Sequence, residues 1–394
     1  MMKEDFEVGI IGGFGHVGLP LGLMFASKNI KTLLIDINEE HYNKILNGKM
    51  PFVEHKASNS LKKNLKNKNL QLSLNFEDVK KSKYIILTIG TPIDEYLNPK
   101  LSNFLDLINQ LSKIVRKNQI LIIRSSIYPN MFKKIKKIMP IYFKSNILYC
   151  PERIQQGYAM IELKQLPQII SGESTNTIKK GKELFLKITK KVIITSVQEA
   201  EFIKLFSNSF RYIHFAIANE FYTICESNNL NYERVRKCMV ESYPRAQGLP
   251  SAGFAAGPCL LKDTMQLSSF FKNNFQLGLS AMNINEGLPN FIVSQLKKEF
   301  KELNELKIGI LGMSFKANID DQRDSLSFKL KKILEFEGAK VLCNDVHLKK
   351  KYFSSLKDIL SNCKILILAT PHKAYQKIKI KKNQTLIDPW SFVK

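Results

Sequence analysis

The chain has 394 residues, of which 44% are hydrophobic; this is too long for one ordinary core and predicts two or three domains. The net charge is +25, but the lysines are spread over the whole length, which favours a solvated surface over a patch for nucleic acid or anionic membrane. The sequence has no N-terminal signal peptide, no apolar run of membrane-spanning length and no CxxC pair. We therefore expect a cytoplasmic protein without a disulfide framework, metal site, membrane anchor or nucleic-acid partner.

The first half of the chain alternates strand-like and helix-like segments. Strands are predicted at residues 6–12, 31–37, 83–90, 119–126 and 145–152, with helical segments between them. This alternation predicts a doubly wound parallel sheet that extends to about residue 195.

From Val197 the pattern becomes helical over about 30 residues that contain neither Gly nor Pro. Further helices are predicted at residues 231–241, 261–275 and 279–300, and the strand–helix alternation returns at residue 306. We predict an α/β protein in which two Rossmann-like, doubly wound parallel-sheet domains are joined by a central all-helical domain. The predicted boundaries are 1–195, 196–303 and 304–394.

A GxGxxG motif follows the first predicted strand and opens the first helix. In this context Gly13 permits a tight turn, Gly15 lets a pyrophosphate approach the backbone, and Gly18 lets the helix pack closely on the strand. Asp36 ends the second strand, where a carboxylate accepts from ribose hydroxyls and repels a 2′-phosphate; this favours NAD over NADP. The alternative is a glycine-rich turn without a ligand. The residues predicted to hold NAD here are Gly13, Gly15, His16, Val17, Gly18 and Asp36.

Three later strand ends are expected to face the same crevice, because ligands of open α/β sheets bind at the carboxyl ends of the strands. They carry Thr91, Ser126 and the tripeptide 151–153. Each alone is more typical of an ordinary loop, and together they favour a site.

On the long central helix, Lys204, Asn208 and Arg211 stand at i, i+4 and i+7 and share one face. A solvated stripe is the alternative, but apolar neighbours surround them. This pattern favours a ligand or a buried network.

Cys259 differs from the other cysteines in its surroundings. Gly257 and Pro258 precede it in a predicted exposed loop, and a helix is predicted to start just after it, with Lys262 close by. A thiol in that position is expected to ionise readily and act as a nucleophile, with Asp263 orienting a base or a water molecule. The remaining cysteines are expected to be buried small hydrophobes: Cys150, Cys225, Cys238, Cys343 and Cys363.

Ordered motifs along nearly the whole chain resemble the UDP-glucose/GDP-mannose dehydrogenase family of nucleotide-sugar 6-dehydrogenases. They include "GIIGGFGHVGLPLG", "SSIYP", "PERIQQG", "EAEFIKLFSNSFR", "GPCLLKD", "LGMSFKANIDDQRDS" and "ATPH". The resemblance implies an NAD-binding domain, a helical dimerisation domain, a nucleotide-sugar-binding C-terminal domain and a homodimer or higher homo-oligomer. It also implies oxidation of the sugar C6 hydroxyl to a carboxylate with two NAD.

The resemblance assigns roles to individual residues. Cys259 would form the thiohemiacetal and thioester, and Lys204 would stabilise the oxyanion or relay the proton, with Asn208 and Asp263 assisting. Glu152 would be the acid/base of thioester hydrolysis. Thr91, Ser126 and Arg323 would contact NAD. The residues implied to hold the nucleotide sugar are Arg153, Ile154, Arg211, Tyr243, Arg245, Phe315 and Lys316.

The chain departs from the family pattern at Ser126 (often Thr), at Asn130 (often Gly) and at residues 256–258, where paired glycines are common. "PER" and "YPR" resemble the UDP-N-acetylhexosamine branch, whereas the lysine of "CLLKD" resembles the UDP-glucose and GDP-mannose branches. We favour a UDP-N-acetylhexosamine, the mannosamine or glucosamine form, oxidised for polysaccharide precursor synthesis. The alternatives are a UDP-glucose or GDP-mannose dehydrogenase, a two-electron NAD enzyme of the hydroxyacid kind, and a basic nucleic-acid-binding protein.

Overall fold

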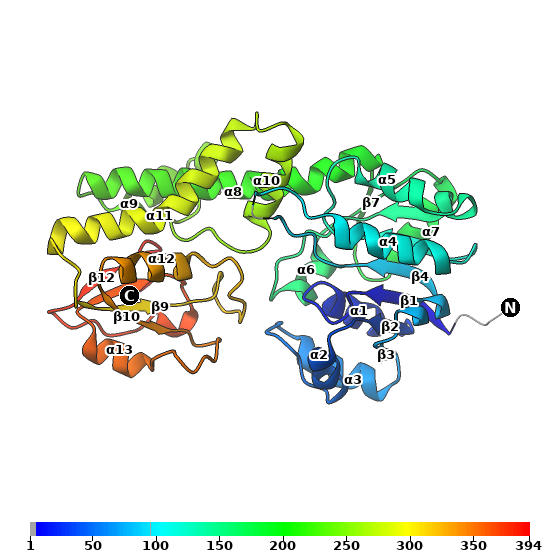
Figure 1. The fold of residues 1–394 in the computed structure, drawn as a ribbon, viewed down its shortest axis with the longest axis horizontal. Helices are drawn as coiled ribbons and strands as arrows, with labels where there is room; N and C mark the ends of the chain where they lie inside the picture. The colour runs from blue at the N-terminus through cyan, green and yellow to red at the C-terminus, as the bar shows by residue number, and fades with distance from the viewer. Residues whose placement is uncertain (1–4, 95) are drawn as a thin grey trace. The chain divides into compact units, whose positions relative to one another are not determined.

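The computed structural model describes residues 5–94 and 96–394. The chain divides into two compact units, Met1–Phe206 and Ser207–Lys394, and the long helix α8 (Val197–Ser227) crosses the boundary between them (Figure 1). The three domain boundaries expected from the sequence stay a prediction.

The first unit is built on an eight-stranded sheet with the order β3-β2-β1-β4-β5-β6-β7-β8. Its strands are β1 (Phe6–Ile11), β2 (Thr32–Ile35), β3 (Leu70–Ser73), β4 (Ser82–Leu87), β5 (Ile120–Ile123), β6 (Ile147–Tyr149), β7 (Gln168–Gly172) and β8 (Val192–Ile194). Neighbours from β3 to β6 run parallel, whereas β7 runs antiparallel to β6 and parallel to β8. The predicted fold class is confirmed, and the strand direction reverses at β7.

Two apolar cores cover the two faces of this sheet, because alternate residues of the central strands point to opposite sides. Ile10 and Ile86 face the core that includes α1, whereas Ile11 and Leu87 face the core that includes α4. The helices of the first core are α1 (Gly18–Ala26), α2 (Glu39–Leu46), α3 (Ala57–Lys66), α6 (Ala159–Gln165) and α7 (Thr175–Leu186). Those of the second are α4 (Ser102–Ile114) and α5 (Met131–Ile138).

The second unit combines helices with a four-stranded parallel sheet of order β10-β9-β11-β12. Its strands are β9 (Lys307–Leu311), β10 (Lys340–Asn344), β11 (Ile365–Leu368) and β12 (Thr385–Ile387). Its further helices are α9 (Tyr232–Val240), α10 (Leu260–Phe270), α11 (Gln276–Phe300), α12 (Leu326–Phe336) and α13 (Leu356–Asn362). One apolar core contains Leu288 and Ile292 of α11 together with Ile308 and Ile310 of β9, so α11 and one face of the sheet pack into a shared core.

Helix α10 ends before the predicted residue 275. Lys272 and Asn273 both adopt positive φ, at 53° and 60°. Residues in this left-handed conformation cannot continue a right-handed helix, so the chain turns there and α11 starts at Gln276.

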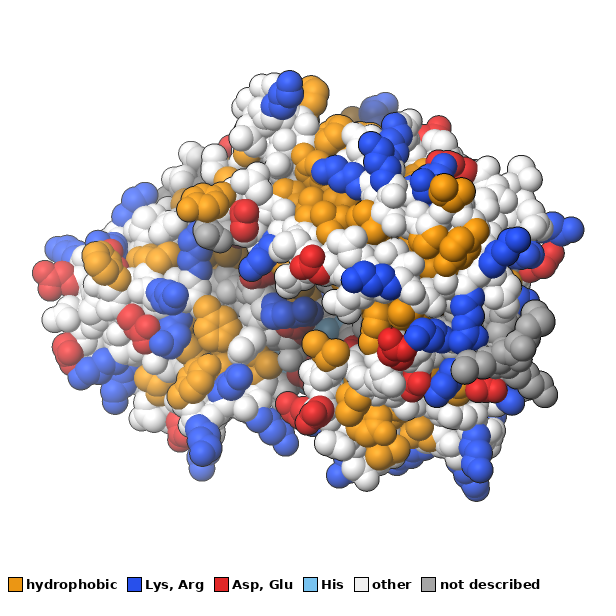
Figure 2. All heavy atoms as spheres, turned by 45° about the vertical axis from the view of Figure 1, so that its right-hand side comes forward, with side chains coloured by type: hydrophobic (Ala, Val, Ile, Leu, Met, Phe, Trp, Pro, Cys, Tyr) orange, Lys and Arg blue, Asp and Glu red, His pale blue; other side chains and the backbone are white. Residues whose placement is uncertain are grey.

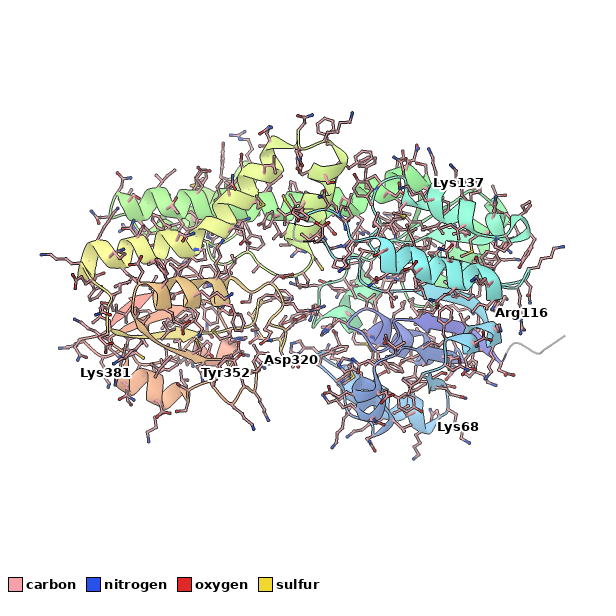
Figure 3. All side chains as sticks on the ribbon, in the orientation of Figure 1. Lys68, Arg116, Lys137, Asp320, Tyr352 and Lys381 are labelled. Atoms are coloured by element: carbon pink, nitrogen blue, oxygen red, sulfur yellow. The ribbon has the colours of Figure 1, made fainter. Side chains whose placement is uncertain are left out.

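The basic surface is dispersed. Figure 2 shows Lys and Arg side chains interspersed with acidic and apolar ones on one face. Lys137 lies on α5, whereas Lys68 and Lys381 lie in loops before β3 and β12 (Figure 3). Among the helices of residues 5–94 and 96–394, none combines the length and apolar character that crossing a membrane requires.

Candidate functional site

The glycine-rich turn after β1 has the packing that its motif predicts, with one change of role. Gly12, not Gly13, holds the positive φ of 77° that makes the turn tight. Gly13 is needed because a Cβ there would lie 2.8 Å from the Ile10 carbonyl oxygen. At Gly18 a Cβ would lie 2.3 Å from the Gly12 carbonyl oxygen, so only glycine lets α1 start so close to the strand.

The start of α1 suits a phosphate group. Val17 caps the helix without a side-chain hydrogen bond, which leaves the first turn open to an anionic ligand. At Gly15 a Cβ would meet only the Gly12 carbonyl oxygen, at 3.4 Å, and at Gly90, which follows β4, it would meet nothing within 4 Å. The backbone can therefore be approached closely at both positions, as a pyrophosphate requires.

Asp36 follows β2 and is tied to the same turn. Its Oδ2 accepts from the Phe14 backbone N–H at 3.0 Å, and its Oδ1 accepts from the Ile37 N–H at 2.8 Å. The carboxylate is therefore held beside the turn, where it can also accept from the hydroxyls of a ribose.

The ends of β4 and β5 come together, as the sequence predicts. The Thr91 hydroxyl donates to the Ser126 carbonyl oxygen at 2.5 Å. His16 of the glycine motif stacks on Phe52, with 3.9 Å between the ring centroids, and its Nε2 lies 3.3 Å from Gln156 Nε2. Asn130 adopts φ 69°, a conformation that Gly adopts freely and Asn tolerates, so this substitution keeps the turn into α5.

The loop after β6 fixes Glu152. Its Oε1 accepts from the backbone N–H groups of Arg153 at 2.7 Å and Ile154 at 2.9 Å, and its Oε2 forms an ion pair with Arg124. Arg153, implied to bind the sugar nucleotide, donates through Nη2 to the Pro167 carbonyl oxygen at 2.6 Å. Ile154 packs against the apolar core.

Sequence reasoning missed Arg124. Its guanidinium is fully buried, although it follows directly on the apolar strand β5. A usable signal was present: the chain has eight arginines among its 60 basic residues, so an arginine directly after a buried strand indicates a specific partner and not a plain surface charge.

Two of the three polar residues predicted on α8 are buried. Asn208 donates to Asp263 Oδ2 at 2.6 Å, and Lys262 Nζ lies 2.6 Å from Asp263 Oδ1. Asp263 is fully buried, so its charge is balanced by Lys262 within the same helix turn. Lys204 is buried too, whereas Arg211 is exposed.

Cys259 is exposed and occupies the N-cap position of α10. The loop before it is pinned from beneath: Gly253 N–H donates to Asn219 Oδ1 at 2.8 Å, and Asn219 Nδ2 donates to Asn285 Oδ1 at 2.8 Å. Gly257 has φ 103°, and a Cβ there would lie 2.4 Å from the Phe315 ring. The backbone in front of the thiol is thus fixed, as a displayed nucleophile requires.

The expectation that Cys238 is buried is wrong, because it lies on the exposed face of α9. The other four cysteines assigned to the interior are buried, as predicted. The general preference of cysteine for the interior does not decide its position on a short helix that packs through only one side.

The remaining candidate residues lie on loops of the second unit. The Arg245 Nε donates to the Tyr243 hydroxyl at 2.8 Å, and both side chains are exposed. Arg323, expected to contact NAD, pairs with Asp321 at 2.6 Å. Contacts with Asp321 raise the pKa of Arg323, and the Cys259 sulfur contributes to the same shift.

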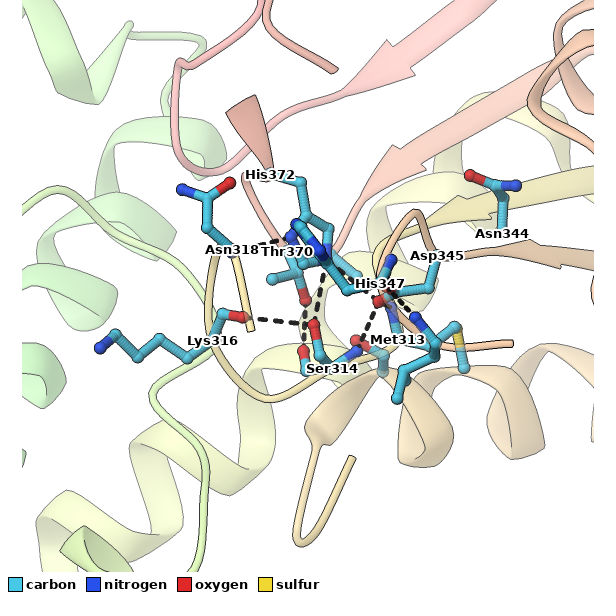
Figure 4. Close-up of polar contacts among 12 residues, drawn as sticks. Met313, Ser314, Lys316, Asn318, Asn344, Asp345, His347, Thr370 and His372 are labelled. Carbon is cyan, nitrogen blue, oxygen red and sulfur yellow. Dashed lines mark hydrogen bonds and ion pairs between the residues drawn. The ribbon is translucent and has the colours of Figure 1, made fainter. Parts of the chain in front are cut away.

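The carboxyl ends of β9, β10 and β11 meet in a buried polar cluster (Figure 4). His372 Nδ1 accepts from the Asn318 N–H at 2.9 Å, so the ring proton is on Nε2, which lies 3.0 Å from both Ser314 Oγ and Asp345 Oδ2. Because Ser314 and Asp345 meet the same ring nitrogen, the three form no catalytic relay. They hold the loop that carries Phe315, and the Lys316 side chain points away from the cluster (Figure 4).

Three domain models of one family match the chain. The NAD binding domain of the UDP-glucose/GDP-mannose dehydrogenase family matches residues 6–189, its central domain residues 198–287 and its UDP binding domain residues 309–394.

Individual proteins resemble the chain over nearly its full length. The UDP-N-acetyl-D-mannosamine dehydrogenase of Methanococcus vannielii is 28% identical over 404 residues, covering 98% of this chain and 93% of that protein. Protein CapL of Staphylococcus aureus is 26% identical over 393 residues, covering 93% and 90%. The solved UDP-D-ManNAc dehydrogenase of Pyrococcus horikoshii has a TM-score of 0.90 at 26% identity, covering 98% of this chain and 96% of that one.

Replacing Asp36 with Asn should weaken NAD binding and reduce the discrimination against NADP. The amide loses the charge that repels a 2′-phosphate and one charge-assisted hydrogen bond, so we expect the Kd for NAD to rise about tenfold. Titration calorimetry with NAD and NADP measures both effects, with the exposed neighbour Glu39→Gln as the matched control. An unchanged NAD-to-NADP ratio in Asp36→Asn would contradict the assignment.

Replacing Asp345 with Asn should destabilise the second unit by about 3 kcal/mol at pH 7, because it breaks a buried charged contact. Burial raises the pKa of Asp345, but the His372 contacts outweigh it and hold that pKa well below its usual range. The carboxylate therefore contributes stability that is present above its unfolded-state pKa of about 3.9 and is lost as the pH falls below that value toward the lower pKa of the folded state. Urea unfolding at pH 7, 4 and 3 should show a steeper decline in the wild type than in the variant; parallel declines would contradict this.

Proposed function

Because the chain belongs to the UDP-glucose/GDP-mannose dehydrogenase family, we propose that it oxidises the C6 hydroxyl of UDP-N-acetyl-D-mannosamine to the carboxylate. The chain is an NAD-dependent nucleotide-sugar dehydrogenase with an NAD-binding first domain and a UDP-binding last domain. The substrate is supported by full-length relatives that are UDP-N-acetyl-D-mannosamine dehydrogenases. The product would serve polysaccharide synthesis.

The observation that carries the chemistry is Cys259, an exposed thiol held at the start of α10 by a pinned loop. Oxidation of an alcohol to an acid removes four electrons from one carbon, and NAD held at the glycine turn and Asp36 would supply the hydride acceptor for each of the two oxidations. Between them the aldehyde must stay on the enzyme. A thiolate achieves this by adding to the aldehyde carbon, and the second oxidation turns that thiohemiacetal into a thioester.

The buried group behind Cys259 suits charge stabilisation. Asn208, Lys262 and Asp263 hold one another through contacts of 2.6 Å, which fixes the first turn of α10. We propose that Lys204, one turn before Asn208 on α8, stabilises the oxyanion that develops on the sugar oxygen. Water then attacks the thioester, Glu152 takes its proton, and the C–S bond breaks to release the uronate and the Cys259 thiolate.

The sugar-nucleotide contacts are proposed for the residues implied by the resemblance. Phe315 lies on Gly257, close in sequence to Cys259, so the UDP-binding loop and the nucleophile loop are packed together within the second unit. Arg245 and Tyr243 form an exposed pair that is suited to bind a phosphate or the nucleobase of the sugar nucleotide. Arg211 is exposed and available to an anionic ligand.

We further propose that the enzyme is a homodimer. Helix α8 exposes an apolar stripe at i, i+7, i+11 and i+14, formed by Phe210, Ile217, Phe221 and Ile224, which are 61%, 39%, 38% and 54% exposed. Stripes of this kind mark interfaces in soluble proteins, and a second copy of α8 would cover it. Six free cysteines suit a reducing compartment, which supports a cytoplasmic location.

Purified protein supplied with NAD and single nucleotide sugars should reduce two NAD per UDP-N-acetyl-D-mannosamine and release a uronate. The panel includes UDP-N-acetylglucosamine, UDP-glucose and GDP-mannose, and kcat/KM is measured from NADH absorbance. Preference for UDP-glucose or GDP-mannose would contradict the substrate, and one NADH per sugar would favour a two-electron enzyme.

Cys259→Ala should lower the rate of uronate formation by at least about a thousandfold, because the variant lacks the thiolate that would hold the aldehyde covalently. Cys238→Ala is the matched control, because Cys238 is the other exposed cysteine and lies on α9. It should turn over at the wild-type rate. Full activity in Cys259→Ala would disprove the covalent mechanism.

A further inference from the structure

Arg124 is a buried charge without a place in the mechanism so far. Its side chain follows β5 and is about 1% exposed. Its Nη1 donates to Gln168 Oε1 at 2.6 Å, and the guanidinium lies 5.2 Å from the centre of the Phe185 ring. Charged side chains are rarely buried to this degree unless a partner balances them, and the partner here is Glu152.

The Glu152 carboxylate meets hydrogen-bond donors on both of its oxygens. Oε1 receives the N–H groups of Arg153 and Ile154, and Oε2 receives Nη2 of Arg124. Donors on both oxygens favour the ionised form and fix one orientation of the carboxylate. The side chain remains 12% exposed, so water can reach it.

The other ionisable groups around this pair are engaged elsewhere or neutral. Burial lowers the pKa of Arg124 to about 10, which leaves it protonated at neutral pH. Burial raises the pKa of Cys150 to about 12, so that thiol is uncharged. Arg153 donates to the Pro167 carbonyl, and Glu162 accepts from the Gln155 N–H. The charge of Arg124 therefore acts on Glu152.

We propose that Arg124 is the positioning residue for thioester hydrolysis, holding Glu152 ionised and aimed as the base that takes a proton from the attacking water. The proposal rests on the proposed function. Without the guanidinium, the carboxylate would rotate and would bind a proton at higher pH. Hydrolysis would slow, whereas the two oxidations that precede it would not depend on Arg124.

The test compares Arg124→Met and Arg124→Lys with wild type by rapid mixing with NAD and UDP-N-acetyl-D-mannosamine. In Arg124→Met we expect a burst of two NADH per active site at nearly the wild-type rate, followed by a steady state about a hundredfold slower. Acid quenching and intact-mass measurement should find the sugar nucleotide attached to Cys259. The acid limb of the steady-state pH profile should move up by about one pH unit, because a carboxylate that loses a cationic partner protonates more easily.

Arg124→Lys keeps the charge and loses the planar fork, so hydrolysis should slow about tenfold with the acid limb near the wild-type position. Arg116→Met is the matched control, the same substitution at an arginine outside the proposed machinery, and it should behave as wild type.

Equal slowing of burst and steady state, with no shift of the acid limb and no acyl-enzyme, would show a purely structural role and overturn the proposal. If Arg124→Met does not fold, Arg124→Lys decides: hydrolysis at the wild-type rate overturns the proposal, and slower hydrolysis behind an intact burst supports it. Wild-type enzyme that yields one NADH per sugar overturns the proposed function itself, and this is seen before any variant is compared.

Discussion

Parallel strands bring their carboxyl ends to one edge of a sheet, and the candidate chemistry of each unit is arranged along such an edge. In the first unit, the glycine turn follows β1, Asp36 follows β2, Thr91 follows β4 and Glu152 follows β6. In the second, Ser314, Asp345 and His372 follow β9, β10 and β11. Residues far apart in sequence become neighbours because the loops that follow parallel strands all lie at the same edge of the sheet.

Buried charge then fixes these loops. Glu152 meets Arg124, Asp263 meets Lys262, and Asp345 meets His372. Removing such groups from water costs several kcal/mol, and a paired contact recovers that cost only in one geometry. The net gain in stability is small, but a misplaced loop would leave a charge uncompensated. Buried pairs therefore act mainly on precision: they hold the Glu152 carboxylate, the start of α10 and the loop that carries Phe315 in single positions.

Local signals were enough to predict the strand–helix alternation, the glycine turn and the exposed Cys259 loop, because turn chemistry and periodicity lie within a few residues. The sequence could not reveal that Arg124 forms an ion pair with Glu152, or that the Asn219 side chain accepts a hydrogen bond from the Gly253 N–H. These contacts join segments that only the fold brings together. Strand direction was hidden for the same reason. The apolar pattern of β7 is compatible with either direction, and its pairing with β6 is antiparallel.

The positions that depart from the family pattern differ in how strongly the backbone conformation restricts the residue type. Asn130 keeps the left-handed turn that Gly would make, so the path of the chain is unchanged. Gly257 cannot vary, because its φ of 103° and the Phe315 ring both exclude a side chain. Ala256 is only half-buried and packs at the margin of the apolar core. Ala256 therefore lies outside the two constraints that fix Gly257, and its side chain can vary without changing the backbone before Cys259.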